Sequence, residues 1–162
     1  MQHVHTAPDA LTYALRAPAT IRAMTEAAQR FLDALSDEQR ATATFPFAGD
    51  ERYFWHYTPI ERNGLMLVNM TDEQRKLALA LMETALGERA TRQAHRIIAL
   101  EPILREHELN DGTPMRWDRN SARYWFSIFG TPGGKEPWGF RVGGHHIGIP
   151  VTVVDGDYIS PL

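Results

Sequence analysis

Apolar residues recur at spacings of three and four along the first part of the chain, beginning just after Pro18. This spacing places them on one side of an α-helix, where they form a stripe that faces a core. Pro18 suits the first turn of such a helix, because a backbone N–H there would have no intrahelical partner. The pattern therefore predicts a helix from Pro18 whose buried face comprises Ile21, Met24, Ala28, Phe31, Leu32 and Leu35.

Two short segments, SDEQR at residues 36–40 and TDEQR at residues 71–75, are nearly identical. In each, a Ser or Thr precedes a Gln by three residues, which is the capping-box spacing of a helix N-terminus. We expect helices to begin at Ser36 and Thr71, and we interpret the repeat as two similar helix starts rather than a duplicated domain. The second helix should stop at Gly87.

A further helical pattern covers residues 88–107, with Ala94, Ile97, Ile98 and Leu104 on its apolar side. Pro102 lies inside this pattern, and it should kink or break the helix because it has no N–H to donate. The polar segment at residues 110–114 is expected to end the helical region.

Aromatic and arginine side chains are concentrated between the two capped helix starts. Residues 52–57 are expected to form a short strand, and residues 65–68 a return strand after a turn at Asn63-Gly64. Two interpretations of the side chains stay open. The rings, Trp55 included, pack in the core, or the segment lines a cleft in which Arg52 and Arg62 hold an anionic group.

The last third of the chain has the alternating pattern of β-strands. A strand is predicted from Tyr124 to Gly130, a loop over residues 131–137, and a hairpin over residues 151–159 around Asp155-Gly156. We therefore predict an α+β fold, with N-terminal helices packed on a C-terminal antiparallel meander. Residues 1–17 are expected to form a flexible tail and residues 18–162 a single domain, helical over 18–108 and β-rich over 115–162.

The stretch WGFRVGGHHIGI, residues 138–149, changes its hydrophobic phase halfway along. Its apolar residues are even-numbered up to Val142 and odd-numbered from Ile147, so a straight strand would switch its apolar face. A two-residue hairpin turn at Gly143-Gly144 or a β-bulge there would restore one face. We favour the hairpin, which places His146 with Arg141 on the polar side and His145 at the rim of the apolar side.

The net charge and the absence of cysteine limit the classes of ligand and partner that we expect the protein to bind. The formal charge is −3 and there is no cysteine. We therefore expect neither nucleic acid nor a membrane surface as partner, and any metal must be held by His, Asp or Glu. The N-terminus lacks the plan of a signal peptide, so we expect a soluble protein of unknown location.

Several motifs occur together in a characteristic order: R-x-x-W-x-Y-x-P-x-x-R-x-G-L at residues 52–65, F-G-x-P at 129–132 and W-G-F-R-x-x-G-H-H at 138–146. Over residues 22–162 the chain resembles the domain-of-unknown-function family 3500. The resemblance implies no activity. Members of that family are usually longer, so it implies that this chain corresponds to the N-terminal half of a larger domain, a truncated copy or one part of a split protein.

The adjacent histidines are the main candidates for chemistry. Two imidazoles beside Arg141 suit a divalent metal such as Zn, Cu or Fe, with His56, Asp155 or Asp157 as a third ligand. They equally suit metal-free acid–base catalysis, or one ring can pack in the sheet while the other faces water. Separately, Met1-Gln2-His3 matches the N-terminal pattern that binds Cu(II) or Ni(II).

Two functional hypotheses result. The first is an enzyme, hydrolytic rather than oxidative, acting on a small polar or anionic substrate. Its catalytic groups or metal ligands would be His145 and His146, with Arg141 as electrostatic partner. The expected substrate-binding residues are Arg52, Trp55, Arg62 and Trp138. The second is a non-catalytic binding or assembly module, completed by the missing half of the domain or by another chain, which could be a second copy of this one.

Overall fold

The computed structural model describes residues 14–112, 114 and 116–160. Within them, one sheet runs in the order β1–β7–β6–β5–β4–β2, and β3 also pairs with β4. All pairings are antiparallel except that of β2 with β4. The strands are β1 (Leu15–Arg16), β2 (Thr44–Phe45), β3 (Leu65–Met66), β4 (Trp125–Phe129), β5 (Trp138–Gly144), β6 (Ile147–Val154) and β7 (Tyr158–Ser160). Together with the helices, this confirms the predicted α+β fold.

The predicted helix starts are confirmed. The helices are α1 (Pro18–Asp33), α2 (Asp37–Ala43), α3 (Asp72–Thr84) and α4 (Glu88–Asn110), with short 3-10 helices η2 (Asp50–Tyr53) and η3 (Leu67–Asn69). Both capping boxes form, at Ser36 with Gln39 and at Thr71 with Gln74. The two glutamine side chains also donate to each other, at 2.8 and 3.0 Å. The repeated sequence thus brings two helix N-termini together.

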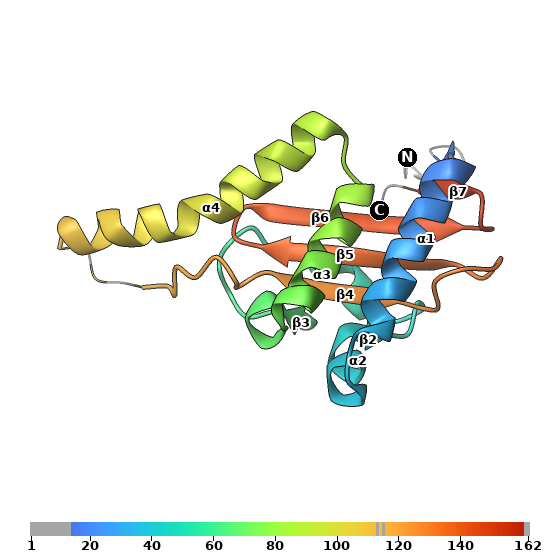
Figure 1. Ribbon diagram of the computed structural model, residues 1–162, viewed down its shortest axis with the longest axis horizontal. Helices are drawn as coiled ribbons and strands as arrows, with labels where there is room; N and C mark the ends of the chain where they lie inside the picture. Colours follow the sequence, from blue (N-terminus) through green and yellow to red (C-terminus); the bar gives the residue numbers. More distant parts are fainter. Residues whose placement is uncertain (1–13, 113, 115, 161–162) are drawn as a thin grey trace, which may run out of the picture.

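Helices α1 and α3 lie side by side on one face of the sheet (Figure 1). The core between them and the strands is almost wholly aliphatic and aromatic, with Phe31, Leu81, Phe126, Trp138 and Phe140 at its centre. Alternate residues of the same strands point to the opposite face. That face is covered by the segment between β2 and β3, which passes behind the sheet in Figure 1. Both faces are therefore buried, which explains why every residue of β5 is inaccessible.

The strand expected at residues 52–57 does not form. Arg52 belongs to η2, and residues 54–64 are irregular. The backbone carbonyls of this segment are bound by two arginine side chains, Arg62 and Arg141, so they need no neighbouring strand. Its rings do not enter the core either, because four of them are 48–60% exposed: Tyr53, Phe54, Trp55 and Tyr57.

Helix α4 begins at Glu88 as predicted but ends later than expected, whereas α3 ends earlier than expected. Helix α3 stops at Thr84, and Gly87 is the N-cap of α4 rather than the end of α3. Beyond it, α4 continues through Pro102 to Asn110, and Figure 1 shows it bent and projecting past the edge of the sheet. The helix therefore has a long distal half with few contacts to the other helices and strands.

The remaining boundaries follow the predictions more closely. The hairpin at Asp155-Gly156 forms, and both residues have the positive φ angles of such turns, 52° and 66°. Leu15 and Arg16, which the sequence placed in a flexible tail, pair with β7. The rest of that tail, residues 1–13 with the Met1-Gln2-His3 motif, lies outside the described residues.

Candidate active site at the β5–β6 turn

The turn between β5 and β6 consists of the two histidines themselves. Gly144 pairs with Ile147, which leaves His145 and His146 as the connecting residues. The expected turn at Gly143-Gly144, with Arg141 opposite His146, is therefore wrong, because Arg141 pairs with Pro150. The apolar residues nevertheless share one face. Three pairs across the strands show this: Trp138 with Val153, Phe140 with Val151 and Val142 with Ile149.

Gly143 and Gly144 are required because neighbouring side chains leave little room for a Cβ at these positions, not because the backbone turns there. Neither has a positive φ, and both lie within β5. A Cβ at Gly144 would lie 2.1 Å from Cδ1 of Tyr124, and one at Gly143 would lie 3.2 Å from Cδ of Arg62. The side chains of Tyr124 and Arg62 thus occupy the space that side chains at these positions would fill. The turn is displaced by two residues onto the histidines, and His146 takes the left-handed conformation with φ 56°.

His145 is held by a buried carboxylate. Its Nδ1 lies 2.5 Å from Oε1 of Glu101, which projects from α4 and is only 4% exposed. We assign the proton to Nδ1, because an ionised carboxylate can only accept. In the neutral ring this assignment makes Nε2 the acceptor nitrogen, and Nε2 has no hydrogen-bond partner among the described residues. A carboxylate that fixes the tautomer and orientation of a histidine is the arrangement found in general-base dyads and triads.

Arg119 completes the charged cluster. Its Nε and Nη2 donate to the two carboxylate oxygens of Glu108 at 3.1 and 2.7 Å, and its Nη1 lies 3.3 Å from Nδ1 of His145. Nη1 is also 3.9 Å from Glu101. The hydrogen bond from Arg119 holds the pKa of the Glu108 carboxyl below its usual range, and that of the guanidinium above it. The fork geometry fixes Arg119 between two acidic residues of α4.

Tyr124 forms a hydrogen bond with the backbone of the turn. Its hydroxyl donates to the carbonyl of His145 at 3.3 Å. Burial, and then the nearby Glu101 carboxylate, raises the pKa of Tyr124 well above that of a free phenol. The hydroxyl therefore stays protonated and acts as a hydrogen-bond donor to the backbone.

A pocket of about 480 Å³ opens beside the dyad. It is lined by Glu101, His145, His146, His107 and four aliphatic residues of α4, Ile97, Leu100, Ile103 and Leu104. The centroids of the His145 and His146 imidazole rings are 4.1 Å apart, and both residues line this pocket. A largely apolar cavity of this size with a few convergent polar groups is typical of a small-molecule site.

Arg141 lies elsewhere and is fully engaged. It is three residues before Gly144 along β5, about 10 Å from the turn at the usual rise of a strand. Its guanidinium binds the Glu51 carboxylate at 2.6 Å and the backbone carbonyls of Glu51 and Phe54. Arg141 therefore fastens the covering segment to the sheet and does not join the histidines.

The other two predicted anion-binding arginines are structural as well. Arg62 is buried and donates to the carbonyls of His56, Thr58 and Ile60, and burial, then Arg141, lowers its pKa. Its Nη2 also reaches the Gly144 carbonyl at 3.3 Å, at the base of the turn. Arg52 binds Phe47 and Thr152 and stacks on neighbouring rings. Each of them forms its hydrogen bonds within the protein.

The predicted metal site finds no support. His56 packs edge-on against Phe54 with the ring centroids 4.7 Å apart, and its carbonyl, not its ring, faces Arg62. Among the described residues, no three His, Asp or Glu side chains are grouped so that they could hold a metal ion. Of the predicted ligands, His145 and His146 lie together in the turn between β5 and β6, whereas Asp155 and Asp157 lie in the turn between β6 and β7.

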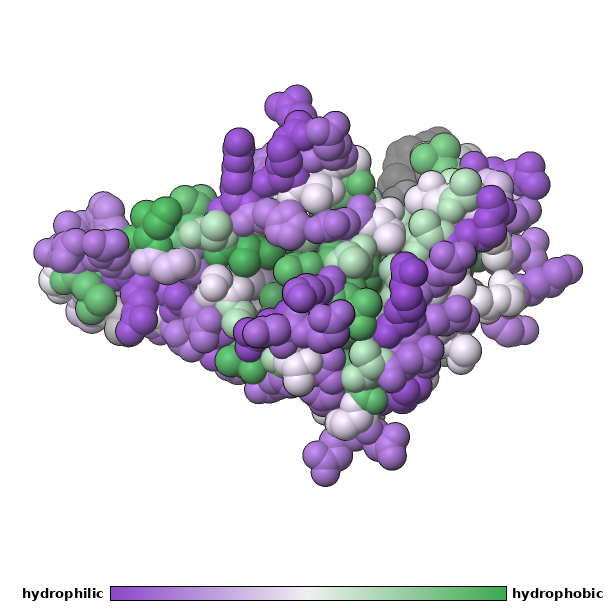
Figure 2. All heavy atoms as spheres, in the orientation of Figure 1, coloured by the Kyte–Doolittle hydropathy of each residue, from purple (hydrophilic) through white to green (hydrophobic). Residues whose placement is uncertain are grey.

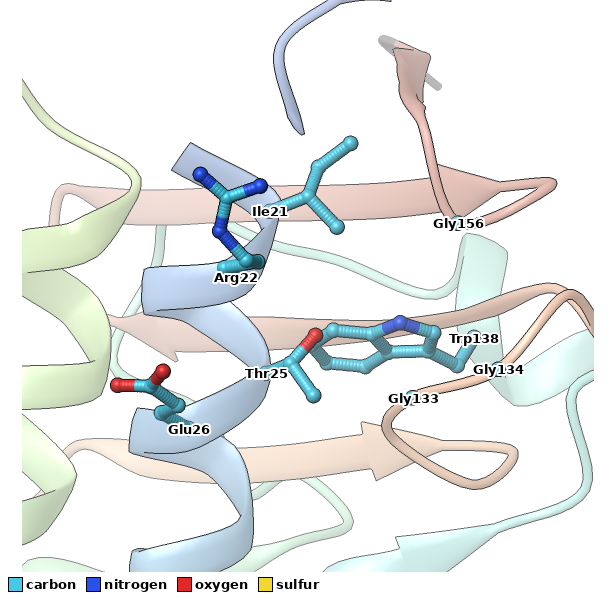
Figure 3. Close-up of a pocket in the computed structure, with 8 residues that line it drawn as sticks. All are labelled: Ile21, Arg22, Thr25, Glu26, Gly133, Gly134, Trp138 and Gly156. Atoms are coloured by element: carbon cyan, nitrogen blue, oxygen red, sulfur yellow. The ribbon is translucent and has the colours of Figure 1, made fainter. Parts of the chain in front are cut away.

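Trp138 is also not available for substrate. Its side chain is fully buried, and its Nε1 has no hydrogen-bond partner among the described residues. Figure 3 shows the indole between Thr25 and Ile21 of α1 and the glycine loop before β5. The pocket there, of about 260 Å³, has Arg22 and Glu26 at its edge, but both point away from the indole (Figure 3). Among the described residues that line it, the charged ones are Arg22 and Glu26, and they form no cluster like that at His145. Trp55 is exposed and stacks edge-on against Tyr57.

Glu101 and Arg119 were missed from the sequence. Glu101 did carry a recognisable pattern, because it interrupts the apolar side of α4 between Ile97 and Leu104, and an acid at such a position needs a partner. Arg119 lies in the irregular segment before β4, where no periodic pattern indicates which way a side chain points.

Comparison with known proteins identifies a family. Residues 17–162 match a family described as "Protein of unknown function (DUF3500)". No curated protein and no solved structure matches the chain. None of the helices in the described residues has the length and apolar character required to cross a membrane.

Proposed function

Because the chain belongs to the DUF3500 family, whose description assigns no activity, we propose a function from the chemistry of its own site: a hydrolase-like enzyme in which His145 is the general base. The observation that carries the proposal is the 2.5 Å contact between Glu101 and Nδ1 of His145 beside an apolar pocket. Imidazole is the commonest general base in proteins, because it exchanges protons near neutral pH.

The proposed reaction is hydrolysis of an acyl bond. Nε2 of His145 takes a proton from a water molecule, and the water oxygen forms a bond to the acyl carbon. The bond to the leaving group then breaks, and Nε2 returns the proton to the leaving oxygen or nitrogen. Glu101 acts as a positioning residue, because it keeps Nδ1 protonated and Nε2 facing the pocket. The exposed ring of His146 lies beside the reacting group and can donate to the developing negative charge.

The pocket changes the expected substrate. Arg52, Arg62 and Arg141 bind protein carbonyls, and Arg119 binds Glu108, so each of these arginines is already engaged. The walls beside His145 are aliphatic. The substrate we propose therefore carries an apolar group, whereas the sequence suggested a small polar or anionic substrate.

A second candidate function is that of a binding or assembly module. It is favoured by the four rings of Tyr53, Phe54, Trp55 and Tyr57, which are about half exposed on the segment that covers the sheet. Large exposed aromatic side chains are enriched at protein interfaces.

Hydrolysis of a panel of p-nitrophenyl esters tests the enzyme proposal. We expect turnover by the wild type and a loss of kcat/KM of about 10² to 10⁴ in His145→Gln, the usual contribution of a general base. Glu101→Gln should lose at least about tenfold, because the tautomer of His145 is no longer fixed. Circular dichroism checks that each variant is folded.

The surface pair of His95 with Glu83, 2.7 Å apart, provides the matched control. His95→Gln and Glu83→Gln remove a similar histidine–carboxylate contact away from the pocket and should leave the rate unchanged. Equal rates in the wild type and His145→Gln, or no turnover of any ester in the panel, would overturn the proposal.

A further inference from the structure

We infer that the substrate is a linear amphiphile whose apolar chain lies along α4 and whose polar part passes His146 into a second pocket. The inference rests on the proposed function for the reacting bond, but the shape and chemistry of the surface support the substrate class independently.

The apolar pocket is long rather than round. Its lining residues on α4 run from Ile97 to His107 on one side of the helix. Ten residues at 1.5 Å each span about 15 Å. Leu100 and Ile103 remain 54% and 60% exposed, and Figure 2 shows apolar side chains gathered over the middle of α4. A linear chain laid along the helix would contact these side chains over the whole length.

A second pocket, of about 200 Å³, continues on the other side of His146. It shares Ile97 and His146 with the first, so the two spaces meet at the turn. Its lining includes Tyr57 and Gln93, which supply hydroxyl and amide groups that the first pocket lacks. Together the two pockets offer an apolar end and a more polar end on either side of the histidines.

The position of the charged groups fits the same substrate. His146 lines both pockets, and the His145 ring, whose centroid is 4.1 Å from that of His146, lines the apolar pocket together with Glu101. The other α4 side chains between Leu100 and Leu104 are aliphatic. At the far end His107 is paired with Asp111 at 3.0 Å. A bond between the apolar chain and the polar part of the ligand would therefore lie beside the paired rings of His145 and His146.

Decanoate, below its micelle concentration, is a suitable binding probe because it has the chain but no bond to hydrolyse. We expect isothermal titration calorimetry to detect decanoate binding to the wild type and no binding of acetate. Leu100→Ser should weaken decanoate binding about tenfold, through loss of apolar contact. Val68→Ser, a matched change at an exposed apolar residue of η3, should leave it unchanged.

Three results would overturn the inference: no decanoate binding, binding that is equal in the wild type and Leu100→Ser, or a dimer that Ile103→Glu converts to a monomer while decanoate does not bind. The last would show that a second copy covers α4. Decanoate binding without hydrolysis of any ester would support the substrate class and overturn the proposed function. Ester hydrolysis that depends on His145 but not on the length of the ester's acyl chain would support the proposed function and overturn the substrate class.

Discussion

Tyr124 covers Gly144 so closely that a Cβ at Gly144 would lie 2.1 Å from Cδ1 of the ring. The ring needs a residue without a side chain at this point of β5, and the strand continues through both glycines before it can turn. This contact determines that the histidines form the turn. It also places His145 next to α4, where its Nδ1 contacts the carboxylate of Glu101 on the apolar side of the helix.

Replacing Gly144 by alanine should therefore destabilise the protein. The new methyl group would overlap the Tyr124 ring, and overpacking of this kind costs about 1–3 kcal/mol of unfolding free energy. Gly148→Ala is the control, because a Cβ there would lie 3.5 Å from Cε3 of Trp55, an ordinary contact. Urea unfolding of both variants measures the difference. Similar stability in the two variants would show that Tyr124 moves aside at little cost.

Arg141→Met should release the segment that covers the second face of the sheet. The substitution leaves the Glu51 carboxylate and two carbonyls without their buried donor, which should cost about 3 kcal/mol. Arg22→Met, at an exposed arginine of α1, should change the stability by no more than about 0.5 kcal/mol. Urea unfolding reports the stability, and the tryptophan fluorescence, to which Trp55 contributes with three other tryptophans, reports the segment. A variant with wild-type stability and impaired ester hydrolysis would instead return Arg141 to the active site.

The pair of Arg119 and Glu108 should make stability depend on acid pH. Arg119 holds the pKa of Glu108 below its unfolded value, so the pair stabilises the fold above the unfolded pKa of about 4.3. This contribution is lost as the pH falls through the lower, folded pKa. Glu108→Gln should therefore be less stable than the wild type at about pH 7, and the gap should narrow towards about pH 3.

Glu106→Gln, an exposed neighbour on α4, is the control for this titration. Its unfolding free energy should equal that of the wild type at both pH values. A gap for Glu108→Gln that stayed constant between the two pH values would contradict the assigned direction of the pKa shift.

Local patterns predicted the elements whose determinants lie within a few residues of each other. The capping boxes at Ser36 and Thr71 and the turn at Asp155-Gly156 depend on such short spacings. All three were found where the sequence placed them. The sequence also predicted that the apolar residues of β5 and β6 share one face. They change from even to odd positions within residues 138–149, which a straight strand could not accommodate.

The position of the histidine turn could not be predicted, because its cause is distant in the sequence. Gly143-Gly144 has the composition of a turn, and only the ring of Tyr124 and the side chain of Arg62 keep it in the strand. In the same way, nothing in the residues around Arg62 or Arg141 distinguishes an arginine that binds its own backbone from one that binds a ligand. The dyad itself joins residues 101 and 145, a contact for which the chain carries no short-range pattern.

The bent helix α4, which contains Pro102, has a consequence for local unfolding. Among the described residues, Glu108 attaches the helix beyond the proline to Arg119 in the segment before β4. Glu101, the residue just before the proline, provides the contact with His145. A segment with so few attachments opens at a lower free energy than the rest of a domain, and its amides exchange with solvent accordingly. Opening of the helix from Glu101 onward would take Glu101 away from His145, so a molecule bound along α4 would slow the exchange of the distal amides. The protection of one helical segment and the occupancy of the site are thus two measures of the same equilibrium.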